Sequence, residues 1–373
     1  MTDVVICGGG IVGLGIAWRA AQAGLDVSVI DPEPASGASH AAAGLLGPVF
    51  EAHPGEEPLL ELNLASYERW PAFAAELADA TSAALELCDG GTLGIALDGD
   101  DLRALDDLCR FHEGLELPVS RLGGRECREI EPMLSPRIRG GVRVATESSV
   151  DPRAVCAALI TAAQQIGVTM TRARVAEVRG SRGRVDGVVI DDGSVLPAGH
   201  VVIALGSWSA NAGLLPPEAT PPVRPVKGQI LRLRFDPMTP PLAGNVRARA
   251  RGRDVYLVPR PNGELVVGAT VEEKGFDTAV TAGAVRDLLE SAIDVVPVVA
   301  ELEQVESMAR LRPASPDNAP VLGETPIEGL LLATGHYRHG VLLTPITAEA
   351  IVSLVIDGKL LAEADGFTLE RFA

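Results

Sequence analysis

The chain opens with a hydrophobic pattern typical of a strand–helix–strand unit. The apolar run 4–7 predicts a strand, and apolar positions at helical spacing over 11–23 predict a helix. Gly24 stands where the end of a helix favours positive φ. Residues 27–30 predict a second buried strand, which ends at Asp31. We therefore expect two neighbouring parallel strands joined by a helix.

From residue 58 to residue 205 the pattern alternates between helices and strands. Asp151 and Pro152 are typical of the N-cap and the first position of a helix. Helices are predicted over 58–88, 101–114 and 151–167. Strands are predicted over 92–97, 142–145, 168–171, 173–178, 187–190 and 201–205. The last of these is continuously apolar, as expected of a strand buried in a parallel sheet.

After a proline-rich link at 216–222, strand patterns crowd together. Strands are predicted over 228–233, 254–258, 264–268 and 329–333, and helices over 281–295 and 347–357. Pro261, Asn262 and Gly263 separate two of these strands and predict a hairpin. Parallel-sheet patterns stand at both ends of the chain, with meander-like strands between them. This order predicts an α/β fold of two interleaved domains.

The two predicted domains differ in the kind of sheet they contain. One is a Rossmann-like nucleotide-binding domain, and the other has a largely antiparallel sheet with helices, of the α+β kind. The first is predicted over 1–85, 145–215 and 311–373, and the second over 86–144 and 216–310.

Composition and charge exclude several classes of protein. The 373 residues carry 32 basic and 50 acidic side chains, a net charge of −18, and 47% of them are apolar. This composition is globular, and its acidity disfavours nucleic acid as a partner. No apolar run reaches the roughly 18 residues of a membrane span, and no basic secretory leader stands at the start, so we expect a cytoplasmic protein. Five scattered cysteines predict reduced thiols, and His336 and His339 lack a third ligand nearby, so no metal site is expected.

Gly8, Gly10 and Gly13 form the G-x-G-x-x-G pattern of dinucleotide-binding turns. The pattern follows a predicted strand and opens a predicted helix, whose N-terminus attracts phosphate. Asp31 stands 21 residues after Gly10, where a carboxylate accepts hydrogen bonds from a ribose. These residues predict a bound dinucleotide but do not separate FAD from NAD.

A second stretch, 39–47, is rich in small residues. Such a loop suits close contact with a flat ring, or equally it is a flexible alanine and glycine loop. Gly37, Ser39 and Ala41 have a spacing close to that of a nucleophile elbow. Without a preceding strand of the right type or a histidine partner, a serine hydrolase is disfavoured.

Several segments in a fixed order resemble the D-amino acid oxidase (DAO) family of flavoproteins, and most of all its glycine oxidase branch from thiamine biosynthesis. They are the 8–13 fingerprint and residues 41–47, 204–209, 224–229, 256–260, 265–270, 311–313 and 335–345. The resemblance covers nearly the whole chain. It implies FAD as the cofactor, held non-covalently because no cysteine follows Cys156 in the region where some relatives tether the flavin.

The resemblance also implies which residues contact FAD. Ile11 and Val12 would bind phosphate through their amides, Asp31 would bind the ribose, and the Val175 backbone would lie near the adenine. Relatives more often have glutamate at position 31, which is one methylene longer. The remaining contacts would come from Ser39, Ala43, Gly44, Leu45, Gly206, Trp208 and a loop under the flavin pyrimidine ring made of Gly335, His336, Tyr337, Arg338, His339, Gly340, Val341 and Leu342.

For the substrate, the resemblance assigns Arg312 to the carboxylate, Tyr256 to the same carboxylate through its hydroxyl, and Arg338 to the mouth of the site. A planar guanidinium suits a carboxylate better than an ammonium does. On the residues alone, Arg312 would belong to a surface ion pair and Tyr256 would be a half-buried strand aromatic. Leu45 and Val271 replace methionines of some relatives, which predicts a pocket of altered volume and unchanged apolar character.

The implied reaction is the oxidation of a small amino acid, namely glycine, sarcosine or a D-amino acid. A hydride would pass to flavin N5, dioxygen would become hydrogen peroxide, and the imine would give glyoxylate and ammonia or pass to thiazole synthase. Two alternatives stay open: a D-amino acid dehydrogenase with another electron acceptor, and a non-enzymatic flavin- or nucleotide-binding partner of the thiamine pathway. A homo-oligomer is left open as well.

Overall fold

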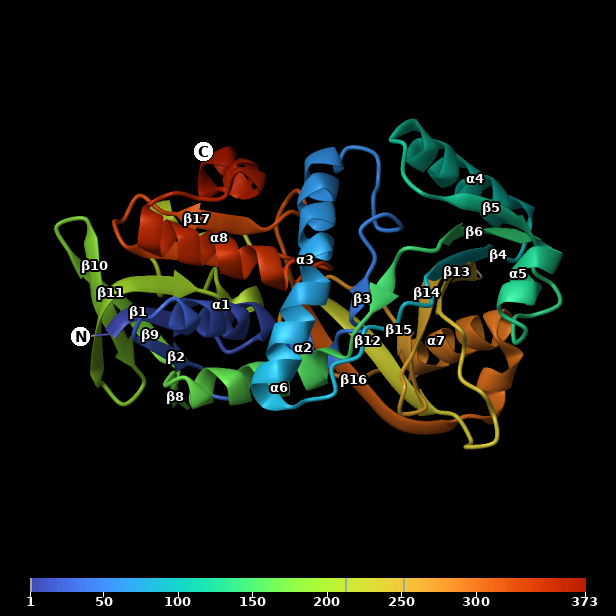
Figure 1. The fold of residues 1–373 in the computed structure, drawn as a ribbon, viewed down its shortest axis with the longest axis horizontal. Helices are drawn as coiled ribbons and strands as arrows, with labels where there is room; N and C mark the ends of the chain where they lie inside the picture. Colours follow the sequence, from blue (N-terminus) through green and yellow to red (C-terminus); the bar gives the residue numbers. More distant parts are fainter. Residues whose placement is uncertain (1, 212, 251) are drawn as a thin grey trace.

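The computed structural model describes residues 2–211, 213–250 and 252–373. In this part of the chain, two eight-stranded sheets lie side by side along the long axis of the molecule (Figure 1). The long helix α3 (Glu57–Thr81) stands between them, and both ends of the chain lie on the side of the first sheet.

The first sheet is mostly parallel. Its main strands lie in the order β17, β18, β11, β1, β2 and β8, and the β9–β10 hairpin extends from β11. The bounds are β1 (Thr2–Cys7), β2 (Val27–Ile30), β8 (Thr169–Thr171), β9 (Val175–Ser181), β10 (Arg184–Ile190), β11 (Val195–Ile203), β17 (Val321–Glu324) and β18 (Leu330–Thr334). Residues at the centre of this sheet are buried on both faces, which explains their continuous apolar runs.

Three helices pack together on the first sheet. Helix α1 (Ile11–Gln22) lies against both α6 (Pro152–Gln165) and α8 (Thr344–Asp357). Gly15 permits the close approach of α1 to α8, because a Cβ there would lie 2.7 Å from Cγ2 of Thr344. The buried residues of these helices and of β1, β2, β11 and β18 form continuous apolar cores.

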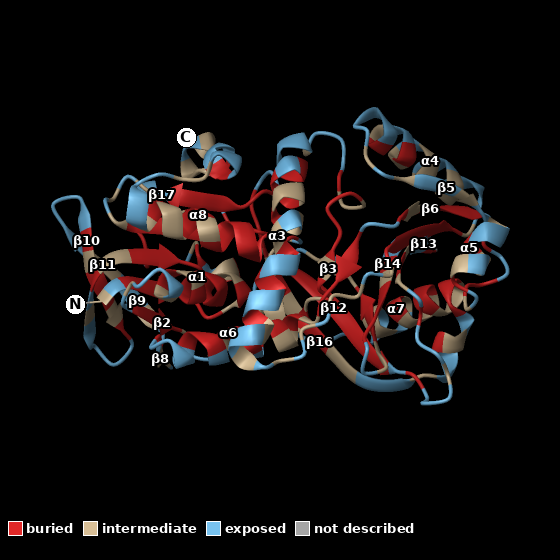
Figure 2. Ribbon diagram, in the orientation of Figure 1, coloured by how far each residue is buried: buried red, intermediate tan, exposed pale blue. Residues whose placement is uncertain are grey.

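The second sheet is antiparallel except where β13 pairs with β4, in the order β16, β12, β15, β14, β13, β4, β6 and β5. The bounds are β4 (Thr92–Ala96), β5 (Ser120–Gly123), β6 (Gly140–Val144), β12 (Arg224–Arg234), β13 (Asn245–Ala250), β14 (Arg253–Pro259), β15 (Glu264–Gly268) and β16 (Glu303–Ala314). Helix α7 (Ala282–Val295) packs on four of these strands and closes a second apolar core. Figure 2 shows the strands of both sheets as mostly buried and the hairpin tips as exposed.

Smaller elements complete the fold. Helices α4 (Gly99–Gly114) and α5 (Gly124–Ile130) lie at the β4–β6–β5 end of the second sheet. Where the two sheets meet, the chain forms α2 (Ala38–Ala41) and the short pair β3 (Leu45–Leu46) and β7 (Ser148–Ser149). The 3-10 helices are η1 (Gly206–Trp208), η2 (Pro217–Ala219), η3 (Pro297–Glu301), η4 (Ala362–Phe367) and η5 (Leu369–Phe372). Among the described helices, none is long and apolar enough to cross a membrane.

The fold class predicted from the sequence is confirmed, with several local corrections. The helix predicted over 58–88 ends at Thr81, because Ser82 adopts a left-handed conformation with φ 56°. Strand β16 was not predicted at all. It is the edge strand of its sheet and carries several charged residues and Pro313, a composition that suits an edge but hides the apolar signal. The strands β3, β5, β7, β13 and β17 were missed as well.

The predicted domain boundaries stay a prediction. Strand β16 runs without interruption across the boundary predicted at residue 311. Residues 1, 212 and 251 of the predicted ranges lie outside the described residues.

Candidate active site

A cavity of about 1120 Å³ lies between the two sheets. One wall begins at the C-terminal ends of β1 and β2, and the opposite wall comes from β12, β14 and β16. Folds with parallel sheets bind nucleotides in the crevice at the carboxyl ends of their strands. The volume exceeds that of a typical pocket for one small ligand, so it leaves room for a dinucleotide and a small substrate together.

Almost all predicted site residues line this cavity. They are Gly8, Gly10, Ile11, Val12, Asp31, Ser39, Ala43, Gly44, Leu45, Val175, Gly206, Trp208, Tyr256, Arg312, His336, Tyr337, Arg338, His339, Gly340, Val341 and Leu342. Gly13 and Gly335 lie outside the lining. A Cβ at Gly13 would collide with the Gly8 carbonyl, and one at Gly335 would lie 3.2 Å from Val321, so these two glycines serve close packing.

The first turn of α1 faces the cavity with free donors. The Ile11 amide donates to Ser39 Oγ at 3.0 Å, whereas the amides of Val12 and Gly13 have no acceptor among the described residues. Gly8 has φ +112°, and a Cβ there would strike the Ala204 carbonyl, so only glycine brings the backbone this close. Free amides at a helix N-terminus next to such a turn fit a phosphate group.

Asp31 is held in place at the end of β2. Its Oδ2 accepts from the Gly9 amide at 2.7 Å and its Oδ1 from the Glu33 amide at 2.8 Å. Each carboxylate oxygen keeps a free lone pair, so the side chain can still accept from ribose hydroxyls. The predicted roles of Asp31 and of the Val12 amide therefore fit the geometry of the cavity, whereas the Ile11 amide already has Ser39 as its acceptor.

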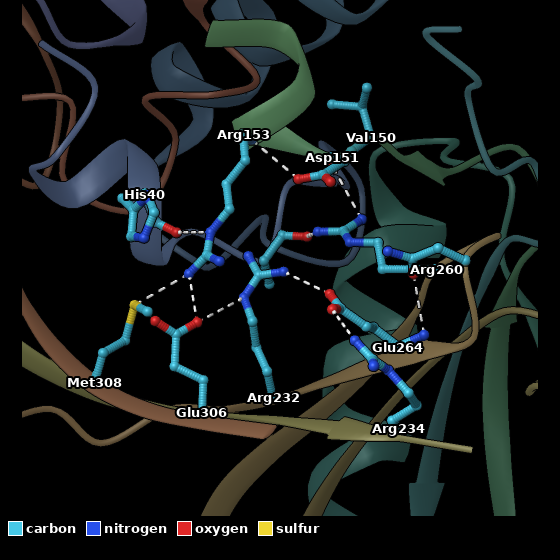
Figure 3. Close-up of polar contacts among 12 residues, drawn as sticks. His40, Val150, Asp151, Arg153, Arg232, Arg234, Arg260, Glu264, Glu306 and Met308 are labelled. Atoms are coloured by element: carbon cyan, nitrogen blue, oxygen red, sulfur yellow. Dashed lines mark hydrogen bonds and ion pairs between the residues drawn. The ribbon is translucent and has the colours of Figure 1, made fainter. Parts of the chain in front are cut away.

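Arginines from outside the cavity hold the loop that follows α2 (Figure 3). Arg260 Nη1 donates to the Val150 carbonyl at 2.9 Å, and Nη2 donates to the Ala43 carbonyl. Arg153 Nε donates to the His40 carbonyl at 2.9 Å. The sequence analysis did not find these contacts, because the donors lie far from the loop in sequence.

Around Arg153 and Arg260 the charged groups form a partly buried network. Glu306 accepts from Arg153 at 2.8 Å and lies 3.8 Å from Arg232, and Glu264 accepts from Arg232 at 3.1 Å (Figure 3). Arg232 is 2% exposed. The network ties the second sheet to the loop that lines the cofactor end of the cavity.

Residues 335–342 form the wall between β18 and α8. The Tyr337 amide donates to the Pro313 carbonyl at 2.8 Å, and His336 Nε2 lies 3.0 Å from Thr347 Oγ1. Burial lowers the pKa of His336 to about 3 and that of His339 to about 4, so both imidazoles are neutral at pH 7. Within the described chain, the amides of Gly340, Val341 and Leu342 have no backbone acceptor. These donors can stabilise negative charge on a ring placed beside them.

At the other end of the cavity, two glycines make room for the predicted substrate residues. A Cβ at Gly228 would overlap the guanidinium of Arg312, and a Cβ at Gly268 would overlap the ring of Tyr256. Arg312 Nη1 donates to the Thr270 carbonyl at 3.0 Å. Burial raises the pKa of Tyr256, so its hydroxyl stays protonated and can donate.

Two charged residues that the sequence analysis missed, Glu51 and Arg247, complete this wall beside the predicted Arg338. Glu51 Oε1 pairs with Arg247 Nη2, and Glu51 Oε2 lies 3.1 Å from Arg338 Nε. Arg247 is paired with Tyr256 across β13 and β14, and its guanidinium lies 5.2 Å from the Phe50 ring. Arginines at alternate positions of a short strand look like solvent-facing residues, so only the fold reveals this group.

One expectation about the pocket is wrong. Val271 was expected to help set its volume, but the side chain is 65% exposed and lies outside the cavity lining. Leu45, the other position named with it, does line the cavity. Val271 lies in the segment that follows β15 (Glu264–Gly268), where the chain turns away from the cavity.

Comparison with known proteins shows which protein family the chain belongs to. The model of the FAD dependent oxidoreductase (DAO) family matches residues 3–354, so the chain belongs to this FAD-dependent family. The glycine oxidase of Geobacillus kaustophilus is 34% identical over 99% of this chain and 97% of its own length. The crystal structure of glycine oxidase from Bacillus cereus matches with a TM-score of 0.89 and 30% identity, covering 99% of this chain and 98% of that one.

Some relatives are longer. The bifunctional protein ThiO/ThiG of Nostoc sp. is 34% identical over 96% of this chain. The chain spans 53% of that relative, about half the length of the first curated relatives it matches.

Proposed function

We propose that the protein is an FAD-dependent oxidase of glycine and other small amino acids, such as sarcosine or D-amino acids. The observation that carries the proposal is the position of Arg312 and Tyr256 on one wall of a cavity whose other end fits a dinucleotide. The similarity to glycine oxidases over nearly the whole chain supports it. The proposed products are hydrogen peroxide and an imine that hydrolyses to glyoxylate and ammonia.

Each residue at the substrate end has a defined task in this proposal. Arg312 binds the substrate carboxylate with its planar guanidinium, and the Tyr256 hydroxyl donates to the same group. Two fixed donors orient the Cα–H bond toward the cofactor end, which removes most of the orientational freedom that slows a bimolecular reaction. When bound, FAD supplies the hydride acceptor and passes the electrons on to dioxygen. The neutral imidazoles of His336 and His339 add no positive charge that would oppose hydride loss from an amine.

The fate of the imine is the finer part of the proposal. The ThiO/ThiG relatives support a transfer of the imine to a thiazole synthase, and so a role in thiamine biosynthesis. Cytoplasmic location and a homo-oligomer stay predictions from the sequence.

A D-amino acid dehydrogenase with another electron acceptor is the second candidate, kept because the same wall would bind any α-amino acid carboxylate. Stopped-flow mixing of substrate-reduced protein with air-saturated buffer separates the two. Rapid return of the flavin band with stoichiometric peroxide supports an oxidase. A reduced flavin that persists in air and reoxidises with a quinone or dye supports the dehydrogenase.

A further inference from the structure

The charged side chains at the substrate end of the cavity do not all have the same kind of partner. Arg247 and Arg338 share the carboxylate of Glu51, and Arg338 also lies 3.7 Å from Glu56. Arg312 is different: among the described residues, no carboxylate lies within ion-pair distance of its guanidinium. Its neighbours are the Thr270 carbonyl and the Tyr256 hydroxyl, which are both uncharged.

Glu51 is ionised in this position. Burial alone would raise the pKa of its carboxyl, but the charges of Arg247 and Arg338 hold that pKa well below its ordinary value. The side chain is 13% exposed, and both of its oxygens face a guanidinium. The wall beside Tyr256 therefore consists of compensated charges, whereas Arg312 has no carboxylate partner among the described residues.

We propose that Glu51 is a specificity-determining residue that limits the site to amino acids with a single carboxylate. It does so by occupying the donors of Arg247 and Arg338, which would otherwise bind a second carboxylate of the substrate. This inference rests on the proposed function, because it assumes that Arg312 takes the substrate carboxylate. The excluded class contains N-carboxymethyl amino acids and amino acids with acidic side chains.

The physical reason is the cost of placing a further carboxylate beside two partly buried guanidinia that already have carboxylate partners. A second substrate carboxylate next to Glu51 would be repelled by it, in a site where little water screens the charge. To pair with Arg247 or Arg338 it would have to displace a carboxylate that already makes charge-assisted hydrogen bonds. Without Glu51, Arg247 would lose its ion-pair partner and Arg338 would keep only Glu56, so the two partly buried guanidinia would become a stronger anion site.

The test uses ligand pairs that differ by one carboxylate. Acetate and malonate are not oxidised, and their binding to the FAD-loaded protein is measured by the shift of the flavin absorption band. Sarcosine and iminodiacetate, which is sarcosine with an added carboxylate, give the matching ratio of kcat/KM. In the native protein we expect acetate to bind more tightly than malonate. We expect kcat/KM to be higher for sarcosine than for iminodiacetate. In Glu51→Gln we expect both ratios to move toward the dicarboxylate by about tenfold or more, the change that corresponds to about 1.4 kcal/mol.

Two further variants keep the test decisive. In Arg247→Met, Glu51 loses one of its two partners, so the ratios should move the opposite way, further against dicarboxylates. In the double variant Glu51→Gln with Arg247→Met the gain of Glu51→Gln should be largely lost. If either single variant folds, retains FAD and leaves the ratios unchanged, the inference is overturned.

The binding of acetate and malonate also separates this inference from the proposed function. If no small amino acid reduces the flavin but acetate and malonate still follow the expected ratios, the proposed reaction fails and the role of Glu51 stands. If glycine is oxidised and the ratios do not respond to Glu51→Gln, the reaction stands and the role of Glu51 fails.

Discussion

Arg260, at the turn between β14 and β15, donates a hydrogen bond to the carbonyl of Ala43 in the loop beside the cofactor end of the cavity. The same guanidinium donates to the Val150 carbonyl at 2.9 Å. Arg260 is 2% exposed, and burial lowers the pKa of its guanidinium. Burying this charge is unfavourable, and the hydrogen bonds to the two carbonyls offset part of that cost. One residue of the second sheet thus fixes the shape of a loop attached to the first.

The first prediction concerns this contact. Arg260→Met should weaken FAD retention by about tenfold or more, because each buried carbonyl left without a donor costs roughly 1–3 kcal/mol and the loop will move to satisfy it. Equilibrium dialysis with flavin fluorescence measures the loss. Arg234→Met is the matched control, since Arg234 is a half-exposed arginine near the same turn that bonds Glu264 and has no contact with the loop. Equal FAD affinity in native protein and Arg260→Met would contradict the prediction.

The second prediction concerns the glycines at the substrate end. Gly228→Ala and Gly268→Ala should raise KM for the substrate and leave FAD affinity unchanged, because the new methyl groups displace Arg312 and Tyr256 respectively. Gly283→Ala serves as a control, since a Cβ there meets no atom within 4 Å. Steady-state kinetics with FAD titration distinguishes the two effects. An unchanged KM in both variants would show that Arg312 and Tyr256 do not set substrate affinity.

The third prediction concerns Arg312 itself. Arg312→Lys should lower kcat/KM by about a hundredfold, because an ammonium keeps the charge and loses the planar two-point contact, a difference of roughly 2.7 kcal/mol. The flavin spectrum and FAD content should not change. A variant with native kcat/KM would remove the carboxylate-binding role.

The fourth prediction concerns pH and the buried carboxyl of Glu147. Its Oε1 accepts from the Val49 and Phe50 amides at 3.0 and 2.7 Å, and burial raises its pKa to about 7. The folded state therefore holds a proton that the unfolded state releases near pH 4.5, so stability falls as pH rises from about 4.5 to about 7 and is level above that range. Glu147→Gln keeps the acceptor and removes this loss, which amounts to roughly 3 kcal/mol.

Thermal unfolding of both proteins across this range measures the effect. Other titrating groups, His336 and His339 among them, are common to both proteins and cancel in the difference. The difference between the Tm of Glu147→Gln and the Tm of the native protein should shift in favour of the variant as pH rises from 5 to 8. A constant difference across the range would show that Glu147 titrates at an ordinary pKa.

The sequence predicts those parts of the site whose residues lie close together in the chain. The turn at Gly8 and the carboxylate at Asp31 lie within one strand–helix–strand unit, so spacing alone places them together. Arg312 needed the resemblance to a family, because its strand β16 carries no clear apolar pattern. Glu51 with Arg247, and Arg260 with Ala43, meet only through the packing of the two sheets. Pairings between residues about two hundred positions apart leave no trace in local periodicity, which is why these groups were missed.

The most direct test of the central claim is the visible spectrum of the purified, FAD-loaded protein before and after anaerobic addition of glycine. The proposed function predicts that the flavin band bleaches on addition and returns with peroxide when air is admitted. A band that survives glycine, sarcosine and D-amino acids alike would contradict the proposed reaction, and a protein that takes up no FAD would contradict the assignment of the cavity itself.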